Sequence, residues 1–206
     1  MRIDPREWPR ADLYKLMTAI VVPRPIAFVS TVGPTGVLNL APFSFFTAIC
    51  SDPPILCFSA SRRDGEKKDT VRNIEFAGEF VVNVVDEAIA EAMNATSADF
   101  PSEISEFEVA GLTPGASDLV RPPRVAESPA SMECRLMQII ELGEAPHQAS
   151  LIIGEVLRFH LRDDLCLERG KVDVAKLRAV GRLVGDLYCH TDGIFGMQRP
   201  QYTAAD

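Results

Sequence analysis

The most constraining feature of the sequence is a run of strand-forming residues that doubles back on itself. Residues 26–32, IAFVSTV, are β-branched or aromatic for the most part and meet GPTG at 33–36, a strong turn signal. Residues 38–46, LNLAPFSFF, are therefore predicted to be the returning arm of a hairpin. Pro42 lies inside that arm, where proline cannot donate to a sheet ladder. The arm is either an ordinary edge strand with a bulge, or a strand that something lies against.

Hairpin-joined strands and few helices are predicted for the rest of the chain. Residues 150–161 alternate apolar and polar side chains from Glu155 on, which is typical of a half-buried antiparallel strand. Because most strands follow one another through hairpins, an antiparallel barrel is favoured over an open parallel sheet. Further strands are expected at 55–61, 80–85 and 131–142, short helices at 12–17, 71–79, 86–98 and 173–177, an irregular surface segment at 99–130, and a closing core segment at 181–191.

Length and composition indicate one domain, residues 1–206, with its core at about 10–190 and polar termini. The net charge of −8 opposes binding to nucleic acid or to an anionic membrane. Pro23, Arg24 and Pro25 interrupt the longest apolar run, and no secretion signal is visible, so the protein is expected in the cytoplasm. Five cysteines without close spacing are expected to be reduced and mostly buried: Cys50, Cys57, Cys134, Cys166 and Cys189.

Common enzyme signatures are missing from the sequence. It contains no GxGxxG, no Gly-Lys-Ser/Thr loop, no HExxH and no GxSxG, and its three histidines are too scattered to predict a metal site. His190, beside Cys189 and Asp192, is a conceivable proton donor, but a C-terminal segment without that role is the commoner case. Catalytic residues are therefore left unassigned.

A charged loop at residues 61–72 precedes the helix predicted at 71–79. Its five basic residues outnumber its three acidic ones, although the whole chain is acidic. Backbone N–H groups at a helix N-terminus bind phosphate well, and Lys68 with the hydroxyls of Ser59, Ser61 and Thr70 would add to such a site. Asp69 or Thr70 is expected to cap the helix. A solvated charged turn is an equally good reading of this loop alone.

The returning arm of the hairpin has the properties of a surface for a flat heteroaromatic ring. Such a ring needs backbone amides that are free of ladder bonds, small side chains and a few polar groups at its edge. Pro42 would interrupt pairing, Ala41 and Ser44 are small, and Asn39 and Thr31 carry polar groups.

Several motifs together resemble the flavin reductase-like family of FMN-binding split barrels, the flavoredoxin group. They are RPIAFVSTVGPTGVLNLAPFSFF, DPP, KDTVRNI and FVVNVV, in this order. The similarity continues through SEFEVAGL, MECRL, GEVLRFHL and GRLVGDLY and covers most of residues 10–190. One departure is Val184, which stands where the closing motif of the family, RLGGxxY, commonly has its first glycine.

The resemblance implies a mainly β fold with a few short helices, an antiparallel split β-barrel, and FMN held without a covalent bond near a homodimer interface. NADH or NADPH would supply the electrons. Carried over residue by residue, the isoalloxazine ring would be lined by Thr31, Asn39, Ala41, Pro42, Ser44 and Phe45. The phosphate would be surrounded by Ser59, Ser61, Lys68, Asp69 and Thr70, and Asn73 would support that loop.

Other functions fit the same motifs. The protein is expected to be a flavin reductase, but a flavin-binding electron carrier or sensor without nicotinamide turnover would keep the same binding site. A haem- or pyridoxal-phosphate-binding relative with a similar barrel is a third reading. Without a dinucleotide fingerprint, a nicotinamide would have to stack over the flavin in an open groove. Residues 99–130 would either cover that groove or wrap a partner subunit.

Overall fold

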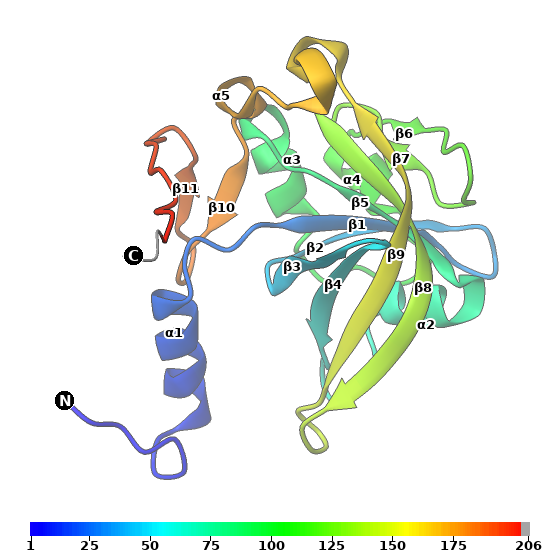
Figure 1. Cartoon of the computed structure of the whole chain (residues 1–206). Coiled ribbons are helices and arrows are strands. Elements are labelled where there is room, and N and C mark those ends of the chain that lie inside the picture. The colour runs from blue at the N-terminus through cyan, green and yellow to red at the C-terminus, as the bar shows by residue number, and fades with distance from the viewer. Residues whose placement is uncertain (203–206) are drawn as a thin grey trace.

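Seven strands form one antiparallel sheet in the computed structural model, which describes residues 1–202 (Figure 1). Their order across the sheet is β2-β1-β5-β8-β9-β4-β3. The predicted antiparallel barrel is confirmed by this sheet. The strands are β1 Ala27–Val32, β2 Leu38–Phe43, β3 Phe46–Ser51, β4 Pro54–Ser61, β5 Glu79–Asn83, β8 Ala130–Leu142 and β9 Ala149–Leu161, with two small hairpins, β6 Pro114–Gly115 with β7 Arg124–Val125 and β10 Val180–Arg182 with β11 Tyr188–His190.

The helices are short and lie outside the sheet. The α-helices are α1 Arg10–Ile20, α2 Asp69–Ala77, α3 Ala90–Ala95, α4 Glu106–Ala110 and α5 Val174–Leu177, and 3₁₀ turns lie at Glu87–Ile89, Asp163–Leu165 and Glu168–Gly170. Asp86 begins the turn before α3 and accepts a hydrogen bond from the N–H of Ala88 at 3.1 Å. The described residues include no helix that is long and apolar enough to cross a membrane.

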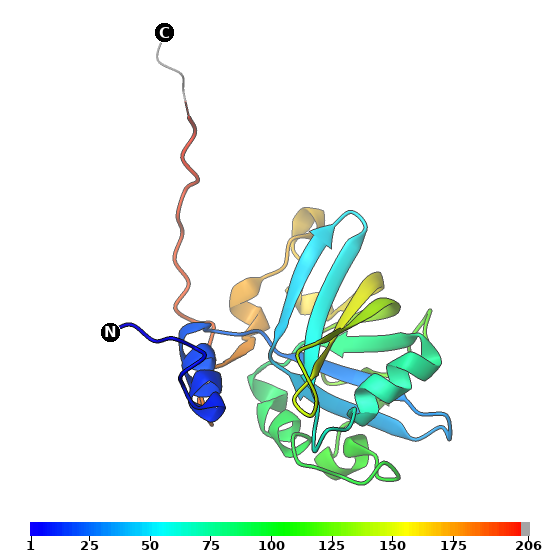
Figure 2. The ribbon, with the colours of Figure 1, turned by 90° about the horizontal axis from the view of Figure 1, so that it is seen from below.

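The barrel closes because its two edge strands are consecutive in the chain. β2 and β3 lie at opposite edges of the sheet, yet only Ser44 and Phe45 join them. Two residues cannot span an open seven-stranded sheet, so the sheet must curl until its edges meet. At that corner the N–H of Ser59 in β4 donates to the carbonyl of Phe45 at 2.8 Å. Figure 2 shows the strands wrapped around a common interior.

Pro42 lies within a fully paired strand, so the prediction that it interrupts pairing is wrong. β2 pairs with β1 as far as Phe43, and Pro42 lies opposite Phe28 without a shift of register. The N–H of Leu40 faces away from β1 and donates to Glu106 at 2.9 Å. Backbone groups alternate along an antiparallel strand, so the nitrogen of Pro42 faces the same outer side and no ladder bond is lost. The edge-strand reading is confirmed, without a bulge at this point.

Aromatic rings fill the interior of the barrel. Phe58 packs against Phe43 and Phe80, with ring centroids 4.9 and 5.7 Å apart. Val71 and Ile74 of α2 are buried in the same cluster, so α2 packs directly onto the barrel. Burial of these side chains supplies most of the stabilisation available to a small barrel.

Residues 99–130 cover the outer face of the first hairpin. Phe107 of α4, Leu112 and Val125 of β7 are buried against Phe28 and Leu40. The segment predicted to be irregular therefore contributes to a second core, because the side chains of β1 and β2 that point away from the barrel interior also need cover. Residues 99–130 thus pack against the main sheet of the same chain, and Figure 1 shows α4, β6 and β7 in this part of the molecule.

Two predictions about local structure are wrong. Neither Asp69 nor Thr70 caps α2. Its N-cap is Lys68, which makes no side-chain cap, while the carboxylate of Asp69 accepts from Arg72 at 2.6 Å. The five cysteines are free, but only Cys134 is buried, and this burial raises the pKa of its thiol. Cys50 and Cys166 are exposed, since Cys50 lies on the edge strand β3 and Cys166 lies in a surface connection.

Helix α1 stands beside the barrel rather than against it, as both Figure 1 and Figure 2 show. Thr18 is its one buried residue, and Tyr14, Met17 and Ile20 are 60%, 51% and 69% exposed. Strand β3 is likewise open, with Ile49 51% exposed. These apolar side chains form an exposed apolar surface on α1 and β3.

Replacing Gly154 by alanine is expected to destabilise the barrel by about 1–3 kcal/mol, the cost of overpacking a core. Gly154 lies in β9 between Leu136 of β8 and Leu56 of β4. An added Cβ would meet the ring of Phe80 at Cζ and lie 2.8 Å from its Cε1, and 3.3 Å from the carbonyl oxygen of Arg135. Chemical denaturation would measure the loss. Gly193→Ala, where nothing lies within 4 Å, is the neutral control.

Glu133→Gln is expected to lower stability by about 1–3 kcal/mol at neutral pH, because a buried charged acceptor is lost. Glu133 is fully buried in β8 and accepts from the N–H groups of Asp118 and Leu119, at 2.7 and 2.6 Å, and contacts His160 Nε2 at 2.5 Å. Burial alone would raise the pKa of Glu133, but these hydrogen bonds lower it below its ordinary value of 4.5.

The pH dependence of stability provides the check on Glu133. A carboxyl whose pKa is lowered by folding stabilises the protein above its ordinary pKa, and that contribution is lost as the pH falls through the lowered value. The difference in stability between wild type and Glu133→Gln should therefore shrink on acidification below pH 4.5. A difference that stayed constant with pH would contradict the assignment.

Candidate functional site

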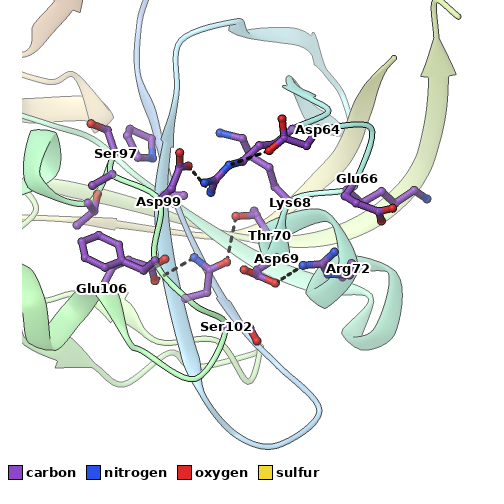
Figure 3. A pocket seen from close by; sticks show the side chains of 18 residues that line it. Asp64, Glu66, Lys68, Asp69, Thr70, Arg72, Ser97, Asp99, Ser102 and Glu106 are labelled. Atoms are coloured by element: carbon purple, nitrogen blue, oxygen red, sulfur yellow. Dashed lines mark hydrogen bonds and ion pairs between the residues drawn. The ribbon is translucent and has the colours of Figure 1, made fainter. Parts of the chain in front are cut away.

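The two sequence motifs meet in one pocket of about 460 Å³. Asn39, Ala41 and Pro42 of β2 line one wall, and Lys68 and Thr70 at the start of α2 line another. The third wall comes from residues 96–106, which connect α3 to α4. Figure 3 shows Lys68, Asp69 and Thr70 on one side of the pocket, with Ser97, Asp99 and Glu106 on the other. The volume lies in the range of ligand pockets.

Most basic side chains of the charged loop are paired with acids. Arg62 contacts Glu141 at 2.9 Å, and Lys67 contacts both Glu75 and Glu141. Arg63 bridges the pocket to Asp99 at 2.6 Å, and Arg72 contacts Asp69. The positive surplus predicted from the sequence is thus largely neutralised within the fold.

Lys68 is the exception within the part of the chain that the structure describes. No carboxylate pairs with its ammonium group, which lies 5.7 Å from the centroid of the Phe43 ring. Lys68 is also the N-cap of α2 and offers no side-chain acceptor to the first-turn N–H groups. An unpaired cation therefore adjoins a helix N-terminus, where the partial positive charge of the helix favours an anion.

Asn39 links three elements at the bottom of the pocket. Its Oδ1 accepts from the hydroxyl of Thr70 in α2 at 3.1 Å, and its Nδ2 donates to Glu106 in α4 at 3.1 Å. Asn39 and Thr70 are 7% and 1% exposed, so these bonds hold the side chains in place. The Thr70 hydroxyl donates its one proton to Asn39, so it cannot at the same time donate a hydrogen bond to a phosphate.

Glu106 is a pocket residue that the sequence did not single out. It is half-buried, and desolvation raises the pKa of its carboxyl, although the hydrogen bonds from Leu40 and Asn39 act in the opposite direction. Its motif SEFEVAGL belongs to the resemblance, but a lone glutamate in a segment without periodicity gives no sign of its role. Asp99 was missed for the same reason, and Ser97 was missed because it lies at the end of the helix predicted at 86–98, where a serine is ordinary.

The remaining predicted residues lie around the pocket rather than in it. Thr31 is fully buried and accepts from Nδ2 of Asn73 at 3.0 Å, so Asn73 ties α2 to β1. Ser59 and Ser61 lie in β4, opposite Leu151 and Ala149 of β9, and do not line this pocket. Phe45 lies at the β2–β3 corner beside Tyr14, at 6.4 Å between ring centroids.

Ser44 opens onto a second cavity, of about 580 Å³. Pro42 and Ser97 line both the pocket and this cavity, so the two adjoin each other there. Arg24, Arg182 and Tyr188 lie on the walls of the cavity. Two adjoining cavities with a proline of an edge strand between them can hold two reactants close together.

The chain is similar to known proteins over most of its length. Residues 17–175 match the family described as "Flavin reductase like domain". Nitrilotriacetate monooxygenase component B from Bacillus cereus is 40% identical, with a TM-score of 0.92 over 96% of this chain and 98% of that one. The 2-nitrobenzoate 2-nitroreductase NbaA from Pseudomonas fluorescens is 33% identical, with a TM-score of 0.90 over 100% and 99% of the two chains.

Flavoredoxin of Desulfovibrio vulgaris shares the fold at a TM-score of 0.77 over 96% of this chain and 97% of that one, with 22% identity. The split barrel expected from the sequence is confirmed by this likeness and by the sheet itself. The family match includes all three walls of the pocket, from β2 through α2 to α4. The chain thus belongs to the flavin reductase-like family that its motifs resemble.

Proposed function

We propose that the protein binds FMN in the pocket and is an oxidoreductase that passes hydride from NADH or NADPH through the flavin to an acceptor. The observation that carries this proposal is the position of Lys68. It is the one basic side chain of the charged loop that has no acidic partner among the described residues, and it shares a pocket with Asn39, Ala41 and Pro42.

The residues at the start of α2 fit the phosphate of FMN. The ammonium group of Lys68 would donate to a phosphate oxygen, and the N–H groups of the first turn would donate beside it. The hydroxyl of Thr70 would act indirectly, by holding Asn39. Ser59 and Ser61, which were carried over from the family, are not needed for this arrangement.

The wall formed by β2 fits a flat ring. Ala41 has a small side chain, and Pro42 presents a ring face and no N–H group on the outer side of the strand. The N–H group of Leu40 donates to Glu106, so this donor on the outer side of β2 is already bonded and does not need a ligand as its acceptor. The side chains of Asn39 and Thr31 are bonded within the protein and would shape this wall rather than bind the edge of the ring.

The flavin would supply the redox chemistry, because FMN accepts a hydride at N5 and releases electrons to an acceptor. This chain's own residues would bind and orient it. Lys68 would fix the phosphate end, and the bonds among Asn39, Thr70 and Glu106 would keep the pocket floor rigid. The Arg63–Asp99 ion pair crosses the pocket and would limit access of water from that side (Figure 3).

The second cavity favours a reductase over an electron carrier or sensor. A carrier needs room for the flavin alone, whereas a reductase needs a place for a second reactant beside it. The cavity of about 580 Å³ beyond Pro42 provides that place. Two similar proteins are consistent with an acceptor: one is component B of a nitrilotriacetate monooxygenase, and the other is a nitroreductase that acts on 2-nitrobenzoate.

A homodimer is part of the proposal. The exposed apolar side chains of α1 and β3 would be buried against a second copy of the chain. Tyr14 of α1 lines the second cavity and lies beside Phe45 at the β2–β3 corner, so a partner subunit that covers α1 and β3 would lie next to this cavity.

The purified protein with added FMN is expected to oxidise NADH or NADPH faster than free FMN does at the same concentration. Loss of nicotinamide absorbance would measure the rate, and the flavin absorbance bands of the protein would show binding. Bound FMN without any increase in rate would favour the carrier or sensor reading. A Soret band in the purified protein would point instead to haem and contradict the proposal.

Lys68→Ala is expected to weaken FMN binding by about 10- to 100-fold, because a hydrogen bond to a charged group contributes about 1.5–3 kcal/mol. Riboflavin lacks the phosphate, so its affinity should not change. Fluorescence titration of both flavins would test this. Lys176→Ala removes the same charge from α5 and is the matched control. An equal loss of riboflavin affinity would show that Lys68 does not act on the phosphate.

A further inference from the structure

The segment that follows β11, residues 192–202, carries large apolar side chains that lie in the solvent. This C-terminal arm contains no helix or strand and extends away from the barrel (Figure 2). Phe195 and Met197 are 80% and 84% exposed, and Ile194 and Tyr202 are exposed as well. Its last backbone hydrogen bond among the described residues is local, from the N–H of Ile194 to a carbonyl two residues earlier. The barrel of the same chain therefore does not cover these side chains.

The composition of the C-terminal arm is that of a contact segment. Tails that stay in water are rich in polar and charged residues. Here Arg199 is the one charged residue in 193–202, and four large apolar side chains fall within nine residues. Ordering an extended segment costs conformational entropy, which burial of apolar side chains against another surface can offset.

Helix α1 presents an apolar stripe that fits such a segment. Leu13, Met17 and Ile20 recur at i, i+4 and i+7, the spacing that places side chains on one face of a helix. Met17 and Ile20 are more than half exposed, and Thr18 is the one buried residue of α1. The barrel thus leaves the stripe largely uncovered.

The C-terminal arm begins close to α1, yet it does not cover the α1 of its own chain. Arg24 donates to the carbonyl of Val21 at the end of α1 and to the carbonyl of Leu183 in the β10–β11 hairpin, so the helix and the start of the arm are neighbours. Both apolar surfaces nevertheless stay exposed. A two-fold axis beside them would bring each arm to the helix of the other copy, and this contact would form twice and close the dimer.

We infer that the C-terminal arm crosses to a second copy of the chain and packs Phe195 and Met197 on the apolar stripe of the partner's α1. The inference goes beyond the proposed function, because it names the two segments that join the copies, and it rests on the homodimer proposed there. A contact through β3 alone would leave both the arm and the stripe in water, whereas exchange of the arms covers both.

Removal of the arm tests this contact. A chain that ends at Asp192 is expected to dimerise at least about 100-fold more weakly than the full chain, because a few buried aromatic and apolar side chains carry most of the energy of an interface. Phe195→Ser is expected to weaken the dimer about 10- to 100-fold. Gln198→Ser changes a polar residue of the same arm and is the matched control. Sedimentation at several protein concentrations would give each Kd, and circular dichroism would show that each variant is folded.

A mixture of two defective chains distinguishes exchange between copies from contact within one copy. One chain ends at Asp192 and keeps an intact α1, and the other carries Met17→Ser with Ile20→Ser and keeps its arm. Each chain alone is expected to dimerise weakly. The mixture should form a dimer at least about tenfold more tightly than either chain alone, because the arm of the second chain can dock on α1 of the first.

Three outcomes would overturn the inference. An unchanged Kd after removal of the arm would show that the arm is not part of the interface. Weak dimers without any gain on mixing would place the contact within one chain. A full chain that stays monomeric would refute the proposed homodimer as well. FMN affinity and nicotinamide oxidation of the full chain, measured on the same samples, would still decide separately whether it is an oxidoreductase.

Discussion

The two-residue link between β2 and β3 is the constraint on which the rest of the structure depends. Ser44 and Phe45 connect strands at opposite edges of a seven-stranded sheet, so the sheet has to close. Closure brings the end of β2 to a corner that β4 contacts through the bond from Ser59 to Phe45. Near this corner, Arg24 donates to the carbonyls of Thr18, Val21 and Leu183 and so joins α1 to the loop after β10. Pro42 is placed at this corner, between the two cavities, by the same closure.

Asn39 gives the pocket its rigidity because it joins segments that are distant in sequence. Thr70 and Glu106 hold its two polar atoms, and both partners come from elements that pack on the first hairpin. A buried polar network of this kind is stable only when every member is satisfied. The loss of Glu106 would release both the Asn39 amide and the N–H of Leu40, so α4 supports the β2 wall of the pocket although it lies outside the barrel.

The sequence predicted the long strands well and the pairing of charges poorly. Residues 131–142 and 150–161 were placed within one residue of β8 and β9, because each is a long strand-like run bounded by loop residues, and the second alternates apolar and polar side chains from Glu155 on. The role of Glu106 could not be predicted, since residues 99–130 show no periodicity and a glutamate is ordinary on a surface. The charged loop appeared basic because its acidic partners Glu75, Asp99 and Glu141 lie elsewhere in the chain.

Electrostatics explains what a few recessed cations do in an acidic chain. Lys68 and Arg182 lie on opposite sides of Pro42 and Ser97, each without an acidic partner among the described residues. Surface acids elsewhere repel anions, while recessed cations attract them, so the field directs anionic molecules toward the cavities. FMN and the nicotinamide nucleotides are both anions that carry flat rings. A cation in each cavity would hold the charged groups of the two reactants apart, and their rings could meet near Pro42, which borders both cavities.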